Sequence, residues 1–234
     1  MQKKTIATFF EYLELVDKSK THTTDLILFR GQSEKKTLVP SIERSNPKVD
    51  TTSTEKKMLE EFIRRTKTMT KGMQFDDEWD WLIYAQHFGM KTRLLDWTSN
   101  PLTALWFACS NEFKKDFDSV VYILKKAETF LLNKSIETSP FKRSKTQVLK
   151  PTLNNERIIA QSGWFTAHKY STSANCFVDL RTNAEIKDSI IEVIIPKGTK
   201  PTVLESLNVF GINSQSLFPD VSGICKQMNW EFSK

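Results

Sequence analysis

Residues 86–109 read QHFGMKTRLLDWTSNPLTALWFAC, a polar run that leads directly into an apolar one. Asn100 and Pro101 predict the start of a helix, because asparagine accepts hydrogen bonds as an N-cap and proline suits the first helical position. Residues 102–109 are apolar around nearly the whole helix, which predicts that the helix is buried. The polar residues before it would then lie at the mouth of a buried helix, either as a structural network or as a binding site.

The rest of the chain alternates helical and strand patterns. Amphipathic spacing predicts helices from Thr5, as N-cap, to about Ser19, from 52 to 69 with a capping box of Thr52 and Glu55, and at 76–87, 202–210 and 216–228. Apolar runs predict strands at 25–29, 119–124, 176–180 and 189–195. We therefore expect an α+β fold, with a mixed or antiparallel sheet and N-terminal helices, in one domain over residues 1–234. The polar, lysine-rich segment 131–153 is predicted to be a flexible insertion.

Composition narrows the functional classes. The net charge of +6 mildly favours an anionic ligand. The seven glycines form neither a P-loop nor a dinucleotide-binding fingerprint, and no metal is predicted because the cysteines and histidines lack ligand spacing. The sequence shows no apolar run of membrane-spanning length and no signal peptide, which predicts a cytoplasmic protein without a membrane partner.

Arg30 follows the predicted strand 25–29 and precedes Gly31 and Gln32. A guanidinium matches phosphate oxygens with parallel hydrogen bonds, and a glycine beside it would let a ligand come close. The pattern therefore predicts an anion receptor. The structural alternative is a buried ion pair of Arg30 with Asp96 or Glu43.

Glu192 lies in the middle of the apolar run IIEVII, residues 190–195. A carboxylate buried in such a strand costs free energy unless it is paired or serves in catalysis. Glu192 is thus a candidate catalytic acid. The alternative is an edge strand on which Glu192 faces water.

Other polar side chains allow both a binding and a structural interpretation. Gln86 and Gln161 carry amides that can recognise a base or bond within the core. Arg93 and Asp96 are three residues apart and can pair with each other. The remaining members of this candidate set are His87, Thr98, Ser99 and Gln32.

Several short motifs, in this order along the chain, resemble the bacterial FRG domain family, which is named after a Phe-Arg-Gly motif. They are LFRGQ (28–32), PSIER (40–44), EWDWL (78–82), QH (86–87), TRLLDWT (92–98) with NP (100–101), ALWFA (104–108), QSGWF (161–165) and LFPD (217–220). The resemblance covers residues 25–223. The sequence FGMK at 88–91 departs from the family pattern, which has a second histidine and a proline before Thr92.

A second resemblance, to ADP-ribosyltransferases, concerns mechanism. Its motifs are Arg30-Gly31, Thr98-Ser99 ahead of Ala104-x-x-Phe107, and Glu192 in the sequence EVIIP. This resemblance implies an ADP-ribosyltransferase-like fold with NAD as cofactor. It implies that Arg30 holds a pyrophosphate oxygen, and that Thr98 or Ser99 orients the nicotinamide ribose. Glu192 would stabilise the positive charge that develops on that sugar.

The sequence thus predicts an FRG domain protein that binds a nucleotide, most directly NAD, with Arg30 and Glu192 as catalytic residues. Its activity would be ADP-ribosyl transfer to a protein or nucleic acid, or NAD consumption, in a toxin or phage-defence effector. The alternatives are a non-catalytic domain that senses a nucleotide or a protein and, from charge alone, nucleic-acid binding. The catalytic hypothesis requires that Arg30 and Glu192 open into one shared cavity.

Overall fold

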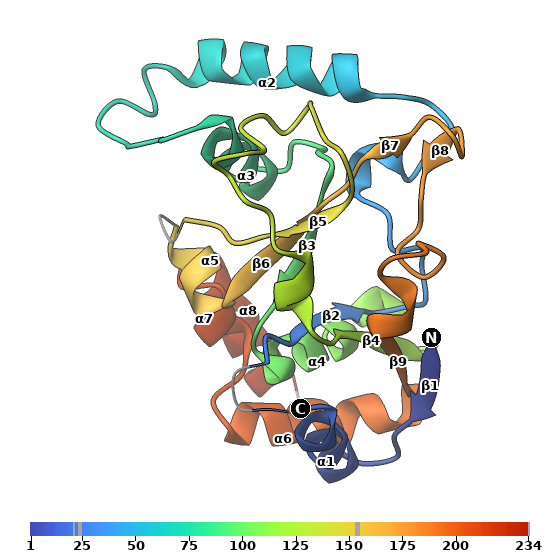
Figure 1. Ribbon diagram of the computed structural model, residues 1–234. Helices are drawn as coiled ribbons and strands as arrows, with labels where there is room; N and C mark the ends of the chain where they lie inside the picture. Colours follow the sequence, from blue (N-terminus) through green and yellow to red (C-terminus); the bar gives the residue numbers. More distant parts are fainter. Residues whose placement is uncertain (21, 23–24, 153–154, 234) are drawn as a thin grey trace.

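The computed structural model describes residues 1–20, 22, 25–152 and 155–233. Within them, seven strands form one mixed sheet in the order β1-β9-β4-β2-β3-β6-β5 (Figure 1). The strands are β1 (Gln2–Thr5), β2 (Leu28–Gln32), β3 (Leu94–Thr98), β4 (Ser119–Leu124), β5 (Gln147–Leu149), β6 (Gly163–Ala167) and β9 (Ile190–Ile195). β1 pairs with β9 in parallel, and the other described neighbours pair antiparallel. The α+β class with a mixed sheet is confirmed.

The described α-helices pack against this sheet and against one another (Figure 1). They are α1 (Phe9–Ser19), α2 (Thr52–Thr66), α3 (Glu78–His87), α4 (Pro101–Cys109), α5 (Glu156–Ala160), α6 (Lys200–Val209), α7 (Ser214–Leu217) and α8 (Val221–Phe232). α1, α4 and α6 pack on the sheet face that carries Phe29, Val121 and Val193. A separate core joins α2 and α3 to β3 and β6. No helix of the described residues has the length and apolar character needed to cross a membrane.

Two elements have the predicted bounds. β4 spans Ser119–Leu124, and all six of its residues are buried. α4 begins at Pro101, and the Asn100 side chain accepts hydrogen bonds from the amides of Leu102 and Thr103. Strong local signals fixed both elements, namely an unbroken apolar run and a complete N-cap.

The predicted N-caps of the first two helices are wrong. Thr8, not Thr5, caps α1 through its side chain, and Thr5 belongs to β1, opposite Ile194 of β9. The predicted capping box of α2 is also wrong, because its N-cap residue makes no side-chain hydrogen bond. Glu55 instead points into the core as a buried partner of Arg93.

Later segments also differ from the prediction. The strand expected at 176–180 is reduced to β8 (Cys176–Phe177), which pairs with β7 (Tyr170–Ser171). The helix expected at 216–228 is two helices, α7 and α8, separated at Phe218-Pro219. The predicted insertion 131–153 contributes β5 to the edge of the main sheet, and its last residue, Leu153, lies outside the described residues.

Candidate functional site

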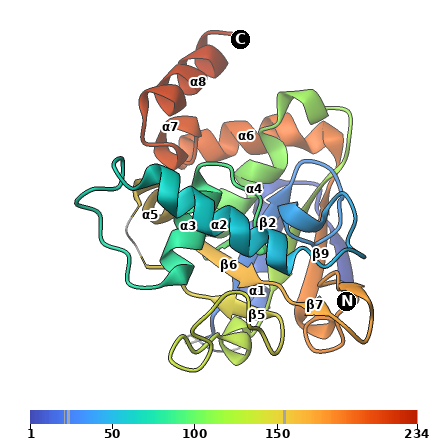
Figure 2. The ribbon, with the colours of Figure 1, turned by 90° about the horizontal axis from the view of Figure 1, so that it is seen from above.

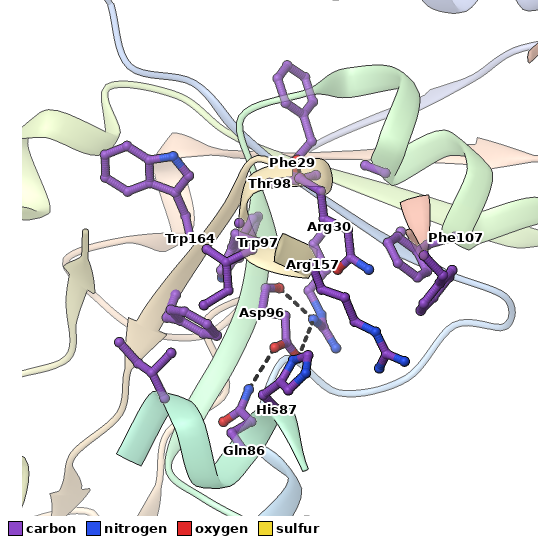
Figure 3. A pocket seen from close by; sticks show the side chains of 18 residues that line it. Phe29, Arg30, Gln86, His87, Asp96, Trp97, Thr98, Phe107, Arg157 and Trp164 are labelled. Atoms are coloured by element: carbon purple, nitrogen blue, oxygen red, sulfur yellow. Dashed lines mark hydrogen bonds and ion pairs between the residues drawn. The ribbon is translucent and has the colours of Figure 1, made fainter. Parts of the chain in front are cut away.

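A cavity of about 370 Å³ lies where β2, β3 and β6 meet α3, α4 and α5 (Figure 3). Its volume is within the range of small-molecule sites. Polar side chains and aromatic rings share its wall. The lining residues are Phe29, Arg30, Gly31, Ile83, Gln86, His87, Asp96, Trp97, Thr98, Ala104, Phe107, Arg157, Ile158, Gln161, Gly163, Trp164, Phe165 and Phe218.

Arg30 lies next to the place where the pairing of β2 with β3 ends. Their described register is the single pair of Phe29 and Thr98. Beyond that pair the Arg30 guanidinium Nη1 donates to the backbone oxygen of Asp96 over 2.5 Å. A side chain thus supplies a hydrogen-bond donor at the point where the strand ladder stops.

Gly31 has a packing role beside Arg30. A Cβ atom at this position would lie 1.9 Å from the backbone oxygen of Ala104 in α4. The glycine therefore allows α4 to rest directly on β2, in addition to lining the cavity. The shift of β2 from 25–29 to Leu28–Gln32 places the whole Phe-Arg-Gly motif inside the strand instead of after it.

Arg30 is only partly neutralised. Its Nη1 lies 3.7 Å from Asp96 Oδ2, and its side chain is 13% exposed. The Nε atom is buried without a hydrogen-bond partner. Burial lowers the pKa of Arg30, and the Asp96 carboxylate opposes that shift. The predicted pairing with Asp96 is confirmed, yet one donor of the guanidinium is left unused.

Asp96 and Gln86 form a second polar unit on the cavity wall (Figure 3). Gln86 Nε2 donates to Asp96 Oδ1 over 2.7 Å, and Gln86 Oε1 accepts from the Thr92 hydroxyl. The Gln86 amide is therefore fixed at both ends. The Asp96 side chain remains 65% exposed, which leaves its carboxylate accessible to a ligand.

The side chains of Thr98 and Gln161 are held by hydrogen bonds to the backbone. The Thr98 hydroxyl donates to the backbone oxygen of Gln161 over 2.6 Å and accepts from the amide of Asn100. Gln161 Nε2 donates to the backbone oxygen of Leu217. These contacts hold the cavity wall together, so both residues position it in addition to lining it.

Arg157 lines the cavity but was not among the sequence-derived candidates. It follows Asn155, the N-cap of the short helix α5. Its guanidinium lies 5.2 Å from the ring centre of Phe218 and pairs with Asp220. The half-buried His87 has its pKa lowered by burial and by the nearby Arg157 charge, which favours a neutral imidazole. The position of Arg157, one helical turn before the QSGWF motif, is the sequence feature that could have identified it.

Three predicted binding residues are absent from the lining of this cavity. Arg93 is 1% exposed and forms an ion pair with Glu55, Nε to Oε2, over 2.7 Å. The expected pairing of Arg93 with Asp96 is wrong, because α2 supplies the carboxylate instead. Ser99 is exposed, and the Gln32 side chain accepts from the amide of Lys36.

Glu192 is also absent from the lining of this cavity. It shares a sheet face with Arg30, because Arg30 faces Tyr122 and Tyr122 faces Glu192 across β2, β4 and β9. Two strand spacings separate the two backbones by roughly 10 Å. The edge-strand alternative is wrong, since β9 lies between β1 and β4 and Glu192 is fully buried.

The Glu192 carboxylate is neutralised by Lys35, which does not line the cavity. Lys35 Nζ lies 2.5 Å from its Oε1 atom, while Oε2 is buried without a hydrogen-bond partner. The requirement that Arg30 and Glu192 line one cavity is therefore not met by the cavity described above. Asp96 is the carboxylate that this cavity offers to a ligand.

The arrangement suits a planar anionic molecule. Two guanidinium groups provide hydrogen bonds for phosphate or carboxylate oxygens. Aromatic rings such as Phe107, Trp164 and Phe218 provide surfaces on which a base can stack. Among the described residues, no group of three or more histidine, cysteine, aspartate and glutamate side chains is arranged to hold a metal ion.

Comparisons with known proteins bear on the first part of the chain. Neither the curated proteins nor the solved structures that were searched include a match. The resemblance to ADP-ribosyltransferases is not supported by these comparisons. A sequence model of one family, described as FRG domain, matches residues 25–117. This part of the chain, which is similar to the FRG domain, brings Arg30, Gln86, His87, Asp96 and Thr98 to the cavity.

Proposed function

We propose that the cavity binds a nucleotide, and that NAD is the first ligand to test. The observation that carries the proposal is Arg30, which lines the cavity with a buried Nε donor that has no partner. An unsatisfied buried donor costs about 1–3 kcal/mol, and more for a charged group. A phosphate oxygen of a ligand would form charge-assisted hydrogen bonds with the Arg30 guanidinium.

The aromatic part of the wall supports a nucleotide over a simple anion. Phe107 and Phe218 lie edge to face, with ring centres 6.1 Å apart, and Trp164 also lines the cavity. Stacking of a base on an aromatic ring contributes about 1–3 kcal/mol. The fixed Gln86 amide and the open Asp96 carboxylate are suited to hydrogen bonds with a base edge or a ribose hydroxyl.

A second candidate function is cleavage of NAD, and the exposed carboxylate of Asp96 favours it. A carboxylate beside the ribose would stabilise the positive charge that builds up as the glycosidic bond to nicotinamide breaks. Asp96 takes this role in the proposal because Glu192 is bound to Lys35 outside the cavity. Transfer to a protein or nucleic-acid acceptor, and a role in a toxin or in phage defence, stay predictions.

Calorimetric titration with NAD tests the binding proposal. Arg30→Gln is expected to weaken NAD binding by about tenfold or more, because it removes charge-assisted hydrogen bonds. Arg65→Gln is the matched control, since Arg65 is 71% exposed on α2, outside the cavity. Circular dichroism of both variants separates lost binding from lost folding. Equal affinity of folded Arg30→Gln and wild type, or the absence of NAD binding to wild type, would reject the proposal.

Nicotinamide release from labelled NAD distinguishes the two candidate functions. Cleavage predicts release that Asp96→Asn abolishes and Glu192→Gln retains. Binding without release assigns the cavity to nucleotide sensing. Release that only Glu192→Gln abolishes would contradict the role given to Asp96.

A further inference from the structure

One charged residue of the cavity, Arg157, is held by a carboxylate outside the FRG match. Arg157 Nη2 lies 2.6 Å from Asp220 Oδ2, and each side chain is 38% exposed. An ion pair with this exposure contributes only about 0.2–1 kcal/mol. A phosphate group can therefore replace Asp220 on Arg157 at little cost in free energy.

Asp220 makes a second contact with its other carboxylate oxygen. Oδ1 accepts a hydrogen bond from the amide of Gly223 over 2.9 Å, which caps the N-terminus of α8. The hydrogen bonds from Arg157 and from Gly223 lower the pKa of Asp220, so its carboxylate stays ionised. A single side chain thus connects the cavity arginine to the first turn of α8.

The residue that caps the end of α7, just before α8, is also part of the cavity wall. Phe218 lines the cavity, and a Cβ atom on Gly223 would lie 1.9 Å from the Phe218 backbone oxygen. The cavity residue Gln161 holds Leu217 at the end of α7. Among the described residues of α8, Gly223 and Gln227 are the buried ones, and the helix projects from the body of the molecule (Figure 2).

We propose that Asp220 is an internal counter-ion of Arg157, which an anionic group of the ligand replaces when the cavity fills. This inference rests on the proposed nucleotide binding, and it specifies how many anionic groups the ligand carries. Arg30 and Arg157 each take one anionic group, so the ligand carries at least two, as a nucleoside diphosphate or a dinucleotide does. Replacement of Asp220 removes the ion pair that ties the first turn of α8 to α5, and filling the cavity loosens α8.

Asp220→Asn tests this role without removing the helix cap, because asparagine is as good an N-cap as aspartate. The variant no longer competes with the ligand for Arg157. NAD affinity, measured by calorimetry, is expected to rise about two- to fivefold, the factor that corresponds to a weak surface ion pair. Asp116→Asn is the control, since it removes one exposed carboxylate elsewhere and should leave the affinity unchanged.

Hydrogen exchange of the amides of 221–232 provides a second readout. NAD should speed exchange in the first turn of α8 in wild type and have no such effect in Asp220→Asn. Binding of NAD with unchanged affinity in Asp220→Asn and unchanged exchange in α8 would overturn the inference and leave the proposed function intact. The absence of NAD binding to either protein would overturn the proposed function and the inference together.

Discussion

Two arginines with similar sequence surroundings have different roles in the folded chain. Both Arg30 and Arg93 lie beside an apolar run and are candidate binding residues in the sequence. The structure separates them by their partners, since Arg93 meets Glu55 in a buried pair while Arg30 retains a free donor in a cavity. Glu55 is 38 residues from Arg93 in sequence. Local patterns could not reveal this partner, because it depends on where α2 packs.

Glu43 gives a prediction at the residue scale. Its side chain is fully buried, Thr51 donates to Oε1 over 2.6 Å, and Oε2 has no partner. Burial raises the pKa of Glu43 to about 7. Between about pH 4.5 and pH 7, Glu43 therefore keeps its proton in the folded state but loses it in the unfolded state. The free energy of unfolding falls as the pH rises through this range, because the folded state must finally ionise a buried carboxyl group.

Glu43→Gln keeps an oxygen for Thr51 and removes the titration. The variant is expected to be more stable than wild type at pH 8, by about 1–3 kcal/mol, and to match it near pH 4. Urea denaturation at both pH values measures the difference. Glu60→Gln, at an exposed position of α2, serves as control. A variant that is less stable than wild type at pH 8 would show that Glu43 is needed in its ionised form.

At the scale of elements, the sequence predicts helices and strands that have strong local signals. It does not predict strands that form only because a neighbouring strand pairs with them. α4 has a complete N-cap at Asn100, and β4 is an unbroken apolar run after Ser119. β1 was missed because its sequence QKKT has no apolar residue; its partner β9 makes it a strand. The split between α7 and α8 at Pro219 was visible in the sequence as a helix-breaking residue.

The contact between α4 and β2 gives a prediction for Gly31. Gly31→Ala places a methyl group against the backbone of α4, at Ala104 and Ala108, where no side chain can move aside. We expect a loss of about 3 kcal/mol or more in the free energy of unfolding. Gly198→Ala is the matched control, because a Cβ atom there has no neighbour within 4 Å. Similar stability of both variants in urea would contradict the close packing of α4 on β2.

At the scale of the whole molecule, the cavity joins segments that are distant in sequence. The FRG match supplies one wall, while Arg157, Trp164 and Phe218 come from later parts of the chain. Seven of the predicted site residues line the cavity: Arg30, Gly31, Gln86, His87, Asp96, Thr98 and Gln161. Glu192 does not, because strand order places Tyr122 of β4 between it and Arg30. Strand order depends on the whole sheet, and the sequence alone could not predict it.

A crystal structure of the protein soaked with NAD would show whether the cavity binds a nucleotide through Arg30 and Arg157. We expect electron density in the cavity, with one phosphate group within hydrogen-bond distance of the Arg30 guanidinium and another at Arg157, and with Asp220 displaced from Arg157. Density for NAD at Lys35 and Glu192 instead, on the other side of Tyr122, would contradict binding in this cavity.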